Sequence, residues 1–326
     1  MPVTVKDVAK LAGVSAATVS RVINNDPRIS LKTREKVIKC IEKLGYQTND
    51  IARSLKISKT HTVGFLCPDI PNDFFMSIAK GVEDELRKYG YSLIICSSNG
   101  NIDEELERIK LLCSKCVDGI IIIPSTNKGE HFNFINSMKI PAVLVDRLVE
   151  DFTADAVLVD NVNGSYSAIE HIINSGYKRI GFIGGDMRLT TAKERYEGYI
   201  RALKDYCIPI EEDIIKFGDF SIESGYNLMG ELMALKKCPD YVFISNYFMH
   251  IGATKYLVEN NNSYPISIAS YDDMELSSIL GFCKVLIRQP MTEIGSRAVK
   301  TLMLRIEDDS TGFPQIIRLK TQLICK

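Results

Sequence analysis

A run of residues near the N-terminus combines small, hydroxyl-bearing and basic side chains at a spacing that suits contact with nucleic acid. Arg21 can donate two hydrogen bonds to O6 and N7 of a guanine, the commonest contact by which a protein identifies a base. Hydroxyl and amide side chains around it suit phosphate groups, and short side chains let a helix lie deep in the major groove. The candidate contacts in this run are Ser15, Ala16, Ala17, Thr18, Ser20, Arg21 and Asn24.

Two short helices joined by a tight turn are predicted to position this run. Thr4 and Asp7 have the spacing of a capping box, so the first helix should begin directly after Thr4. Gly13 should end that helix, because glycine adopts the left-handed conformation readily, and Ser15 should begin the second. A connection of about four residues that contains glycine is typical of the helix-turn-helix motif.

A third helix is predicted from Lys32 to Leu44, with Ser30 as its cap, because two short helices cannot bury a core alone. The three apolar faces would then close a small bundle. The side chains that we expect to face inward are Val5, Val8, Ala9 and Leu11 from the first helix, Val19, Val22 and Ile23 from the second, and Val37, Ile41 and Leu44 from the third.

The charge distribution sets the first sixty residues apart from the rest of the chain. The whole chain has a net charge of −1, but residues 1–60 contain 12 of its 40 basic residues and only 5 of its 41 acidic residues. This segment therefore carries a net charge of +7, and the remainder carries −8. A compact basic module on an acidic body is typical of a protein that binds a polyanion.

The segment 4–24 (TVKDVAKLAGVSAATVSRVIN) resembles the signature of the lactose-repressor (LacI) family of bacterial transcription regulators. The segment 46–55 (YQTNDIARSL) resembles the hinge of that family, except that Thr48 stands where proline is usual. The resemblance implies that the hinge becomes a helix on operator DNA and wedges a leucine into the minor groove, where an apolar wedge kinks the duplex. The further DNA contacts that the resemblance implies are Thr4, Ser30, Tyr46, Asn49, Ala52, Arg53 and Leu55.

After Thr62 the pattern changes to short apolar runs that alternate with amphipathic segments. The predicted strands are 63–68, 92–98, 119–125, 140–146, 156–160, 179–185, 241–245 and 266–272, with another near 214–219 and a final one at 316–325. The predicted helices are 73–90, 102–116, 163–175, 192–205 and 250–258. Such alternation predicts parallel sheets covered by helices on both faces, and its two successive series predict an α/β core of two doubly wound lobes.

Polar and aromatic side chains follow several of these strands. Ligands of such folds bind beside the carboxyl ends of the strands, so the cleft between the two lobes is the expected site. Aromatic rings suit the apolar face of a sugar or base, carboxylates accept from hydroxyls, and a guanidinium can clamp hydroxyls or hold a phosphate or carboxylate. The candidate effector contacts are Asp73, Phe74, Phe75, Arg147, Thr191, Arg195, Phe220, Asn246, Tyr247 and Asp272.

Four segments of the core also resemble landmarks of the LacI family: 178–185 (KRIGFIGG), 194–199 (ERYEGY), 270–273 (SYDD) and 287–295 (IRQPMTEIG). The resemblance thus covers essentially the whole chain and implies a core similar to periplasmic sugar-binding proteins. It implies effector contacts by Arg195, Asn246 and Asp272 and stacking by Phe74, Phe75 and Phe220. Tyr247 stands where the family usually has aspartate, so no particular family ligand is carried over.

The resulting plan is a small all-α headpiece at 1–46, a hinge at 47–61 and a core at 62–326. We expect an N-terminal lobe at about 62–160 and 291–320 and a C-terminal lobe at about 161–290 and 321–326. A homodimer is expected, because two headpieces related by a two-fold axis match the two halves of a pseudopalindromic operator.

Enzymatic motifs are lacking in this sequence. It contains no G-x-G-x-x-G, G-x-S-x-G, H-E-x-x-H or P-loop motif, so we expect no catalytic site, cofactor or metal. Cys113 and Cys116 could form half of a redox or metal site, but no second pair accompanies them, and nine scattered cysteines suit a reducing cytosol. No apolar run is long enough for a membrane span and the N-terminus has no apolar signal core, so we expect a cytoplasmic bacterial protein, nucleoid-associated when bound to its operator.

The sequence therefore predicts a sequence-specific DNA-binding regulator, expected to be a repressor, under allosteric control by a sugar or sugar derivative. Effector binding would move the lobes and change the hinge on DNA. Two alternatives stay open: a sugar-binding protein without a DNA role, which would need a signal peptide, and a regulator controlled by a phosphoprotein corepressor.

Overall fold

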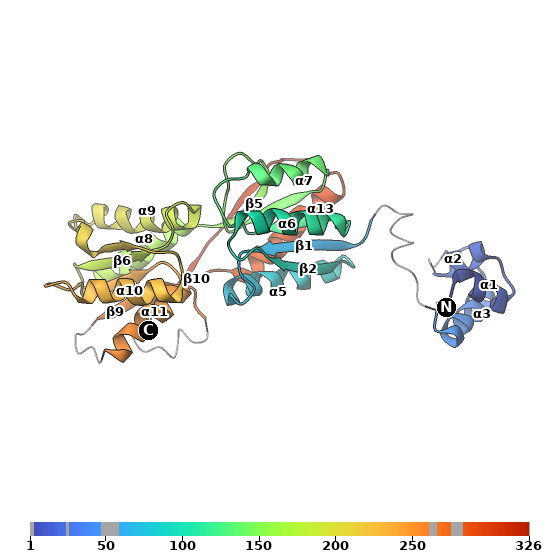
Figure 1. The fold of residues 1–326 in the computed structure, drawn as a ribbon, viewed down its shortest axis with the longest axis horizontal. Coiled ribbons are helices and arrows are strands. Elements are labelled where there is room, and N and C mark those ends of the chain that lie inside the picture. Colours follow the sequence, from blue (N-terminus) through green and yellow to red (C-terminus); the bar gives the residue numbers. More distant parts are fainter. Residues whose placement is uncertain (1–2, 24–25, 47–58, 261–265, 275–282, 326) are drawn as a thin grey trace. The chain divides into compact units, whose positions relative to one another are not determined.

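A computed structural model describes residues 3–23, 26–46, 59–260, 266–274 and 283–325. The chain divides into two compact units, Met1–Thr60 and His61–Lys326 (Figure 1). We call the first unit the headpiece and the second the core, and each is described by itself.

The described part of the headpiece forms three helices, α1 (Val5–Ala12), α2 (Ala16–Ile23) and α3 (Leu31–Leu44). At the start of α1 the Thr4 amide donates to the Asp7 carboxylate at 2.9 Å, and Gly13 ends the helix with φ 62°. At the start of α3 the Ser30 hydroxyl accepts from the Thr33 amide at 3.3 Å. The helix ends therefore follow the caps that the sequence predicts.

A small apolar core joins the three helices. Its buried members are Val8, Ala9, Ala12, Val19, Val22 and Val37, and the partly buried side chains against it include Val5, Ile23, Ile41 and Leu44. The prediction that Leu11 faces inward is wrong, because its side chain is 43% exposed while Ala12 is fully buried. Side chains four residues apart share one face of a helix, so the buried face of α1 passes through Val8 and Ala12.

The core contains two six-stranded sheets with equivalent strand orders, β11-β5-β4-β3-β1-β2 and β12-β10-β9-β8-β6-β7. The first comprises β1 (Thr62–Cys67), β2 (Ser92–Ser97), β3 (Gly119–Ile122), β4 (Ala142–Val145), β5 (Asp155–Val159) and β11 (Ile316–Leu319). The second comprises β6 (Ile180–Gly184), β7 (Ile215–Phe217), β8 (Tyr241–Ile244), β9 (Ser267–Tyr271), β10 (Cys283–Arg288) and β12 (Gln322–Cys325). We call the first sheet with its helices the N-lobe and the second the C-lobe.

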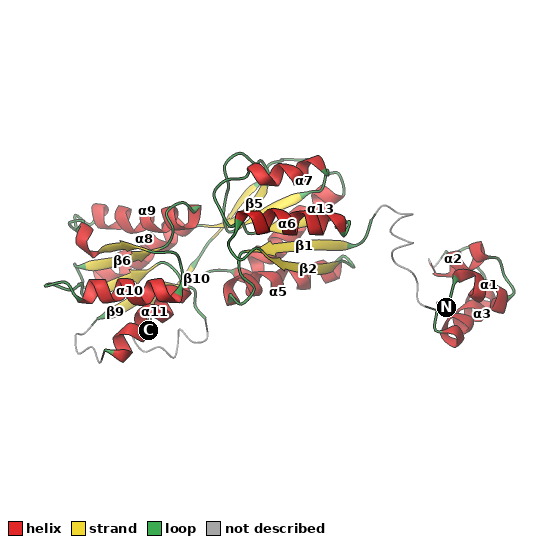
Figure 2. Ribbon diagram, viewed as in Figure 1, coloured by secondary structure: helices red, strands yellow, loops and turns green. Residues whose placement is uncertain are grey.

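Helices cover both faces of each sheet (Figure 2). In the N-lobe, α5 (Asp73–Lys88) and α13 (Met291–Ile306) pack on one face, and α6 (Ile102–Ser114) and α7 (Asn133–Ser137) pack on the other. In the C-lobe, α8 (Asn161–Asn174) and α9 (Thr190–Asp205) lie opposite α10 (Ile222–Met233) and α11 (Tyr247–Glu259). Short 3-10 helices lie at Glu130–Phe132 and Glu212–Ile214. Within the described ranges, no helix is long and apolar enough to cross a membrane.

The predicted fold class is confirmed, with a difference at the end of the chain. The run 316–325 is not one strand: β11 pairs in parallel with β5 in the N-lobe, and β12 pairs antiparallel with β10 in the C-lobe. The run contains neither glycine nor proline, so its apolar pattern gives no sign of the change of sheet. The sequence prediction also left β10, α7, α10 and α13 without an assignment.

Three short segments lead from one lobe to the other, and we call them the crossovers. The first is residue 160, between β5 and α8. The second is 289–290, between β10 and α13, and the third is 320–321, between β11 and β12.

Candidate functional site

Helix α2 turns its predicted DNA contacts outward. Val19 and Val22 are buried in the headpiece core, which fixes the rotation of the helix about its axis. Ala16, Ala17 and Arg21 are exposed on the opposite side. The surface is therefore shallow near the start of the helix and carries one long guanidinium a turn later, an arrangement that suits a major groove.

The hydroxyl groups of the predicted contacts lie at helix starts. At the start of α2 the Thr18 amide donates to the Ser15 hydroxyl at 3.1 Å. Thr4 and Ser30 are the N-terminal capping residues of α1 and α3. A helix N-terminus attracts phosphate through its free amides and its dipole. Ser20 is half-buried, and Tyr46 packs partly buried against the headpiece core. The predicted contacts Asn24, Asn49, Ala52, Arg53 and Leu55 lie outside the described residues.

The core contains a cavity of about 710 Å³, within the range of small-molecule sites. Residues of both lobes line it, and nine of the ten predicted effector contacts are among them. The nine are Phe74, Phe75, Arg147, Thr191, Arg195, Phe220, Asn246, Tyr247 and Asp272.

The tenth predicted contact, Asp73, does not line the cavity. It is the exposed first residue of α5, and its neighbour Asn72 lines the cavity instead. The Asn72 side chain caps the helix by accepting from the Phe74 amide at 3.0 Å.

Asp146 and Arg147 form the N-lobe wall of the cavity. Oδ2 of Asp146 lies 3.2 Å from Nε of Arg147, while Oδ1 is buried without a hydrogen-bond partner among the described residues. Arg147 also donates to the Pro124 carbonyl at 2.9 Å, and its guanidinium lies 5.8 Å from the centre of the Phe75 ring. Burial raises the pKa of Asp146 and lowers the pKa of Arg147, because water solvates neither charge well.

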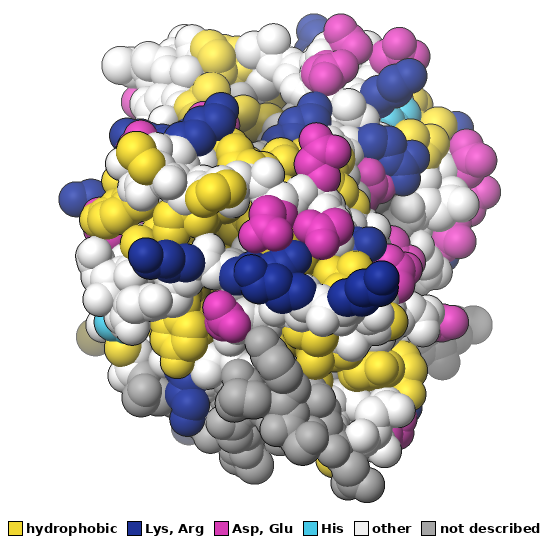
Figure 3. All heavy atoms as spheres, turned by 90° about the vertical axis from the view of Figure 1, so that its left-hand side faces the viewer, with side chains coloured by type: hydrophobic (Ala, Val, Ile, Leu, Met, Phe, Trp, Pro, Cys, Tyr) yellow, Lys and Arg dark blue, Asp and Glu magenta, His cyan; other side chains and the backbone are white. Residues whose placement is uncertain are grey.

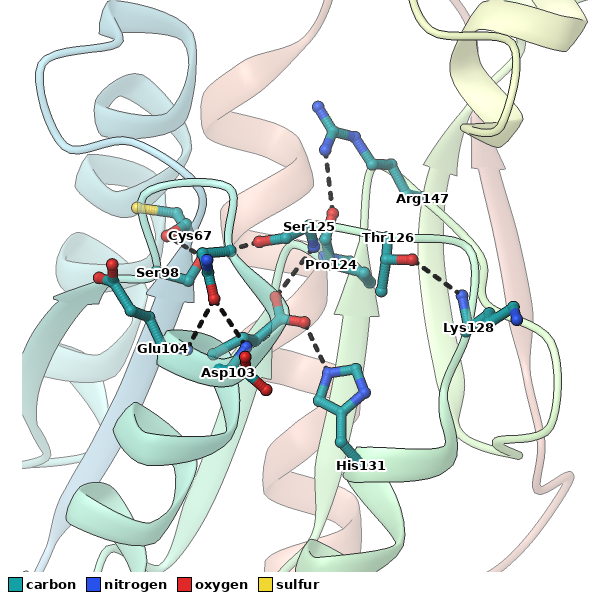
Figure 4. Close-up of polar contacts among 12 residues, drawn as sticks. Cys67, Ser98, Asp103, Glu104, Pro124, Ser125, Thr126, Lys128, His131 and Arg147 are labelled. Carbon is teal, nitrogen blue, oxygen red and sulfur yellow. Dashed lines mark hydrogen bonds and ion pairs between the residues drawn. The ribbon is translucent and has the colours of Figure 1, made fainter.

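A buried network fixes the backbone behind this wall (Figure 4). The Ser125 amide donates to Oε1 of Glu105 at 2.9 Å, and the Ser125 hydroxyl pairs with that of Ser98 at 2.7 Å. The second Glu105 oxygen lies 2.7 Å from Nε2 of His131. Because Ser125 itself lines the cavity, the network positions a part of the cavity wall.

Arg195 is held in place on the C-lobe wall. Its Nε donates to Oδ1 of Asn161 at 2.9 Å, and its Nη1 donates to the Ser245 carbonyl at 2.6 Å. The guanidinium carbon lies 4.0 Å from the centre of the Tyr271 ring. With its side chain fixed on three sides and 4% exposed, Arg195 presents its remaining donors in one orientation. Thr191, also on α9, is buried beside the cavity.

Asp272 accepts hydrogen bonds from two cavity residues. Gln289 donates to its Oδ1 at 2.6 Å, and the Tyr247 amide donates to its Oδ2 at 3.4 Å. Burial raises the pKa of Asp272, against the opposing effect of the nearby Arg195 charge. The Gln289 carbonyl oxygen is buried without a hydrogen-bond partner among the described residues. A ligand that donates hydrogen bonds would satisfy this acceptor.

The two lobes present their buried carboxylates in the same way. Asp146 follows β4 and Asp272 follows β9, strands that occupy equivalent places in the two sheets. Both residues have a left-handed backbone, with φ of 68° and 71°, and each amide donates to the next strand at 3.0 Å. Aspartate tolerates this conformation better than most residues do. The fold thus places one acidic side chain from each lobe at the cavity.

Aromatic side chains line further parts of the cavity. The rings of Phe74 and Phe75 lie 5.5 Å apart edge to face. Phe220 has φ of 71°, and its carbonyl accepts from the Asn246 side chain at 3.0 Å. A Cβ on Gly185 would overlap the Phe220 ring, so the ring can lie where it does because residue 185 has no side chain.

The sequence prediction missed several cavity residues, namely Ser125, Asp146, Asp186, Asp219, Phe248 and Gln289. For Asp146 a signal was present: it ends the strand 140–146 as Asp272 ends the strand 266–272. Gln289 lies at a crossover, whose place beside the cavity follows from the pairing of strands rather than from any local pattern.

The profile of the family described as "Bacterial regulatory proteins, lacI family" matches residues 4–49. The profile described as "Periplasmic binding proteins and sugar binding domain of LacI family" matches residues 60–297. Among curated relatives, the HTH-type transcriptional repressor PurR of Actinobacillus pleuropneumoniae serotype 5b (strain L20) is 33% identical over 326 residues, which cover 99% of this chain and 97% of PurR.

Two solved structures are similar over the whole chain. The complex of the transcriptional regulator CelR with cellobiose has a TM-score of 0.74 and 28% identity, and the match covers 99% of this chain and 98% of CelR. The Lac repressor dimer bound to operator and the anti-inducer ONPF has a TM-score of 0.87 and 23% identity, over 99% of this chain and 98% of that one, which is a likeness of fold. These matches confirm the resemblance found in the sequence: the chain belongs to the LacI family of bacterial regulatory proteins, and is a DNA-binding transcription regulator and not an enzyme.

Proposed function

We propose that this protein is a repressor that binds a pseudopalindromic operator as a homodimer, and that a sugar or sugar derivative in the core cavity changes its affinity for DNA. The observation that carries the proposal is the gathering of nine expected effector contacts around one cavity, in a chain that begins with a helix-turn-helix headpiece. Relatives support it: PurR is named a repressor, and CelR was solved with cellobiose.

The chemistry of the cavity favours an uncharged ligand with many hydroxyl groups. Its buried wall carries two carboxylates, Asp146 and Asp272, and two guanidiniums, Arg147 and Arg195. The less buried lining adds three carboxylates (Asp69, Asp186 and Asp219) and one guanidinium (Arg188), so the cavity as a whole has no excess of positive charge for an anionic ligand. Two buried acceptors, Oδ1 of Asp146 and the carbonyl of Gln289, have no hydrogen-bond partner among the described residues. Hydroxyl groups can donate to such acceptors and accept from the guanidiniums, while aromatic rings cover the apolar face of a sugar.

We assign the parts of the chain accordingly. The headpiece (1–46) would read the operator through Arg21 and the exposed start of α2, and the hinge (47–61) would enter the minor groove through the segment that contains Leu55. The core (62–326) would bind the effector and form the dimer, with lobes at about 62–160 and 291–320 and at about 161–290 and 321–326. The nine predicted effector contacts that line the cavity are our candidates for ligand binding.

A groove on the N-lobe, lined by apolar side chains and by Lys80, Glu83 and Arg87, suits the contact between subunits. It has a volume of about 550 Å³ and lies between α5 and the edge strand β2, with Met76, Tyr91, Leu93 and Ile95 among its lining residues. The Ile95 side chain is 40% exposed there. An unpaired strand edge with apolar neighbours favours association, and a second copy of this chain would cover it in a two-fold arrangement.

The headpiece is the expected DNA-binding surface. On the core face that Figure 3 shows, basic and acidic side chains intermix with apolar ones, and neither sign of charge forms a continuous field. The net charge of +7 in residues 1–60 contrasts with this face. Because the partner is operator DNA, we place the protein in the bacterial cytoplasm, nucleoid-associated when bound.

A thermal-shift screen on the full chain tests the effector. The panel comprises glucose, galactose, ribose and cellobiose, the 6-phosphates of glucose and galactose, and adenosine. We expect an unphosphorylated sugar to raise the melting temperature, because a ligand that binds only the folded state stabilises it. That sugar should then change the affinity for a duplex selected by the protein from random DNA by about 5- to 150-fold. A sugar that binds without any effect on DNA affinity would contradict allosteric control by a sugar alone.

A further inference from the structure

We infer that Glu194 and Arg318 form a strap that holds the cavity residue Arg195 in register with the crossovers between the lobes. Neither residue lines the cavity, so their role is to position another side chain and not to touch a ligand. The regulatory meaning of the strap rests on the function proposed above, whereas the strap itself rests on the contacts that follow.

One side-chain amide joins Arg195 to Glu194. Asn161 directly follows the first crossover and is completely buried. Its Oδ1 accepts from Nε of Arg195 at 2.9 Å, and its Nδ2 donates to Oε2 of Glu194 at 3.1 Å. Nδ2 also lies 3.4 Å from the Val159 carbonyl. Loss of the Glu194 carboxylate would leave Nδ2 only this longer contact and so loosen the acceptor that aligns Arg195.

The second oxygen of Glu194 reaches the strand that leads into the third crossover. Nη2 of Arg318, on β11, donates to Oε1 of Glu194 at 2.7 Å. Nη1 of Arg318 lies 3.4 Å from the Val159 carbonyl, at the end of the strand that leads into the first crossover. The carboxylate of Glu194, which precedes Arg195 in the chain, is thus connected through Asn161 to the first crossover and through Arg318 to the strand that leads into the third.

The first and third crossovers also each contact an element that adjoins the other. The Asp160 amide donates to the Leu319 carbonyl at 2.9 Å. A Cβ on Gly164 would lie 2.8 Å from the Thr321 hydroxyl, which shows how closely the start of α8 approaches the third crossover. A displacement of one crossover would therefore change the contacts of the other.

The strap matters for geometry more than for stability. The side chains of Arg318 and Glu194 are 40% and 19% exposed, and partly exposed ion pairs contribute little net stability. If the lobes move, Arg318 of the N-lobe shifts against Glu194 of the C-lobe, and Glu194 can hold Asn161 and Arg195 in this alignment only in arrangements that preserve its contact with Arg318. A ligand that needs Arg195 in this orientation would favour those arrangements, which is the differential interaction that coupling requires.

The exchange rate of the Arg195 Nε proton with water tests the strap without effector or DNA. It is measured by NMR on the full chain labelled with 15N-arginine, and Arg195→Lys identifies the resonance. We expect Glu194→Ala and Arg318→Gln each to raise the exchange rate by about fivefold or more, as expected when one hydrogen bond is lost. The double variant should exchange no faster than the faster single variant, because both changes break one path. Arg318→Lys keeps the charge and should restore part of the protection.

Lys216→Gln is the matched control, because Lys216 also forms a partly exposed ion pair in the C-lobe, with Glu231 at 3.2 Å, away from Asn161. It should leave the Arg195 resonance unchanged. Unchanged exchange in both strap variants, or additive effects in the double variant, would overturn the inference. If no sugar binds but the strap variants still raise the exchange rate of the Arg195 proton, the proposed effector is contradicted and the strap is supported. The two proposals can therefore be tested separately.

Discussion

Asp272 illustrates how a cavity holds charge at a cost to the folded state. It is 4% exposed, and burial raises its pKa above the ordinary value of 3.8. The folded protein therefore binds this proton more tightly than the unfolded chain does. The free energy of unfolding falls as the pH rises from 3.8 through the raised pKa, and the loss is complete above that pKa.

We predict that Asp272→Asn raises the melting temperature at pH 7 by about 2–4 °C, the shift that roughly 1 kcal/mol produces in a domain of this size. The amide oxygen can still accept from Gln289 and the buried charge is gone; the contact given up is the long bond from the Tyr247 amide, at 3.4 Å. The gain should shrink as the pH falls through the raised pKa of Asp272, because the wild-type carboxyl then also becomes uncharged. Asp219→Asn is the contrast, because hydrogen bonds from Ser221 lower the pKa of Asp219, and its replacement should destabilise at pH 7. A lower melting temperature of Asp272→Asn at pH 7 would show that the carboxylate is net stabilising.

Arg21 is the residue through which the headpiece should recognise sequence. It is exposed on α2, one turn beyond the small side chains of Ala16 and Ala17. We predict that Arg21→Ala weakens binding to the selected duplex by about 1–3 kcal/mol, the worth of one good bidentate base contact, and weakens binding to random DNA much less. Fluorescence anisotropy at fixed salt measures both. Arg28→Ala removes an exposed arginine that is paired with Asp26, and should affect both DNAs alike. Equal losses for Arg21→Ala would leave it a phosphate contact only.

At the scale of elements, the end of β6 and the loop before α10 are built around one ring. Gly185 follows β6, and Phe220 stands two residues before α10 with its ring against Gly185. We predict that Gly185→Ala destabilises the core by about 1–3 kcal/mol, as overpacking of a filled site does. Phe220→Ala removes the ring, so Gly185→Ala added to it should cost much less than it does alone. Urea unfolding of the two single variants and the double variant measures this interaction energy, and additive losses would contradict the contact.

Local sequence patterns sufficed wherever local forces decide the structure. Helix caps at Thr4, Gly13 and Ser30 and buried strands such as 63–68 follow from short-range rules. Where the chain changes sheet they did not suffice: the run 316–325 reads as one strand, yet its halves pair with different partners. That choice depends on strand neighbours distant in sequence.

The same limit applies to the cavity. Residues at the ends of single strands, such as Arg147 and Asp272, could be predicted because the carboxyl ends of parallel strands share one edge. Asn161 and Glu194 could not, since their importance comes from contacts across the crossovers. Asp73 was predicted together with Phe74 and Phe75, which line the cavity, but the cap of α5 brings Asn72 to the cavity in place of Asp73.

At the scale of the whole molecule, the separation of charge explains how one chain can bind DNA and a neutral ligand. The positive charge resides in residues 1–60, while the remaining residues carry −8, which disfavours unspecific contact of the core with DNA. The affinity for operator should therefore fall steeply with salt, because basic side chains displace counterions from the phosphates. Salt should have little effect on a neutral sugar in the cavity.

Dimerisation is the property that joins the two functions. One headpiece makes few contacts, and two that are held on a common axis bind two half-sites at once. We predict that Ile95→Lys, which places a charge beside the apolar side chains of Tyr91 and Leu93 in the groove between α5 and β2, converts the protein to a monomer. Analytical ultracentrifugation measures the mass, and anisotropy should show a loss of at least about 100-fold in affinity for the selected duplex, because the gain from joining two binding modules is lost. Ile210→Lys is the control, since Ile210 is 38% exposed in the C-lobe and outside that groove. Its mass and DNA affinity should match the wild type. A dimeric Ile95→Lys variant would place the subunit contact elsewhere, and a monomer with full affinity would contradict the two-fold mode of binding.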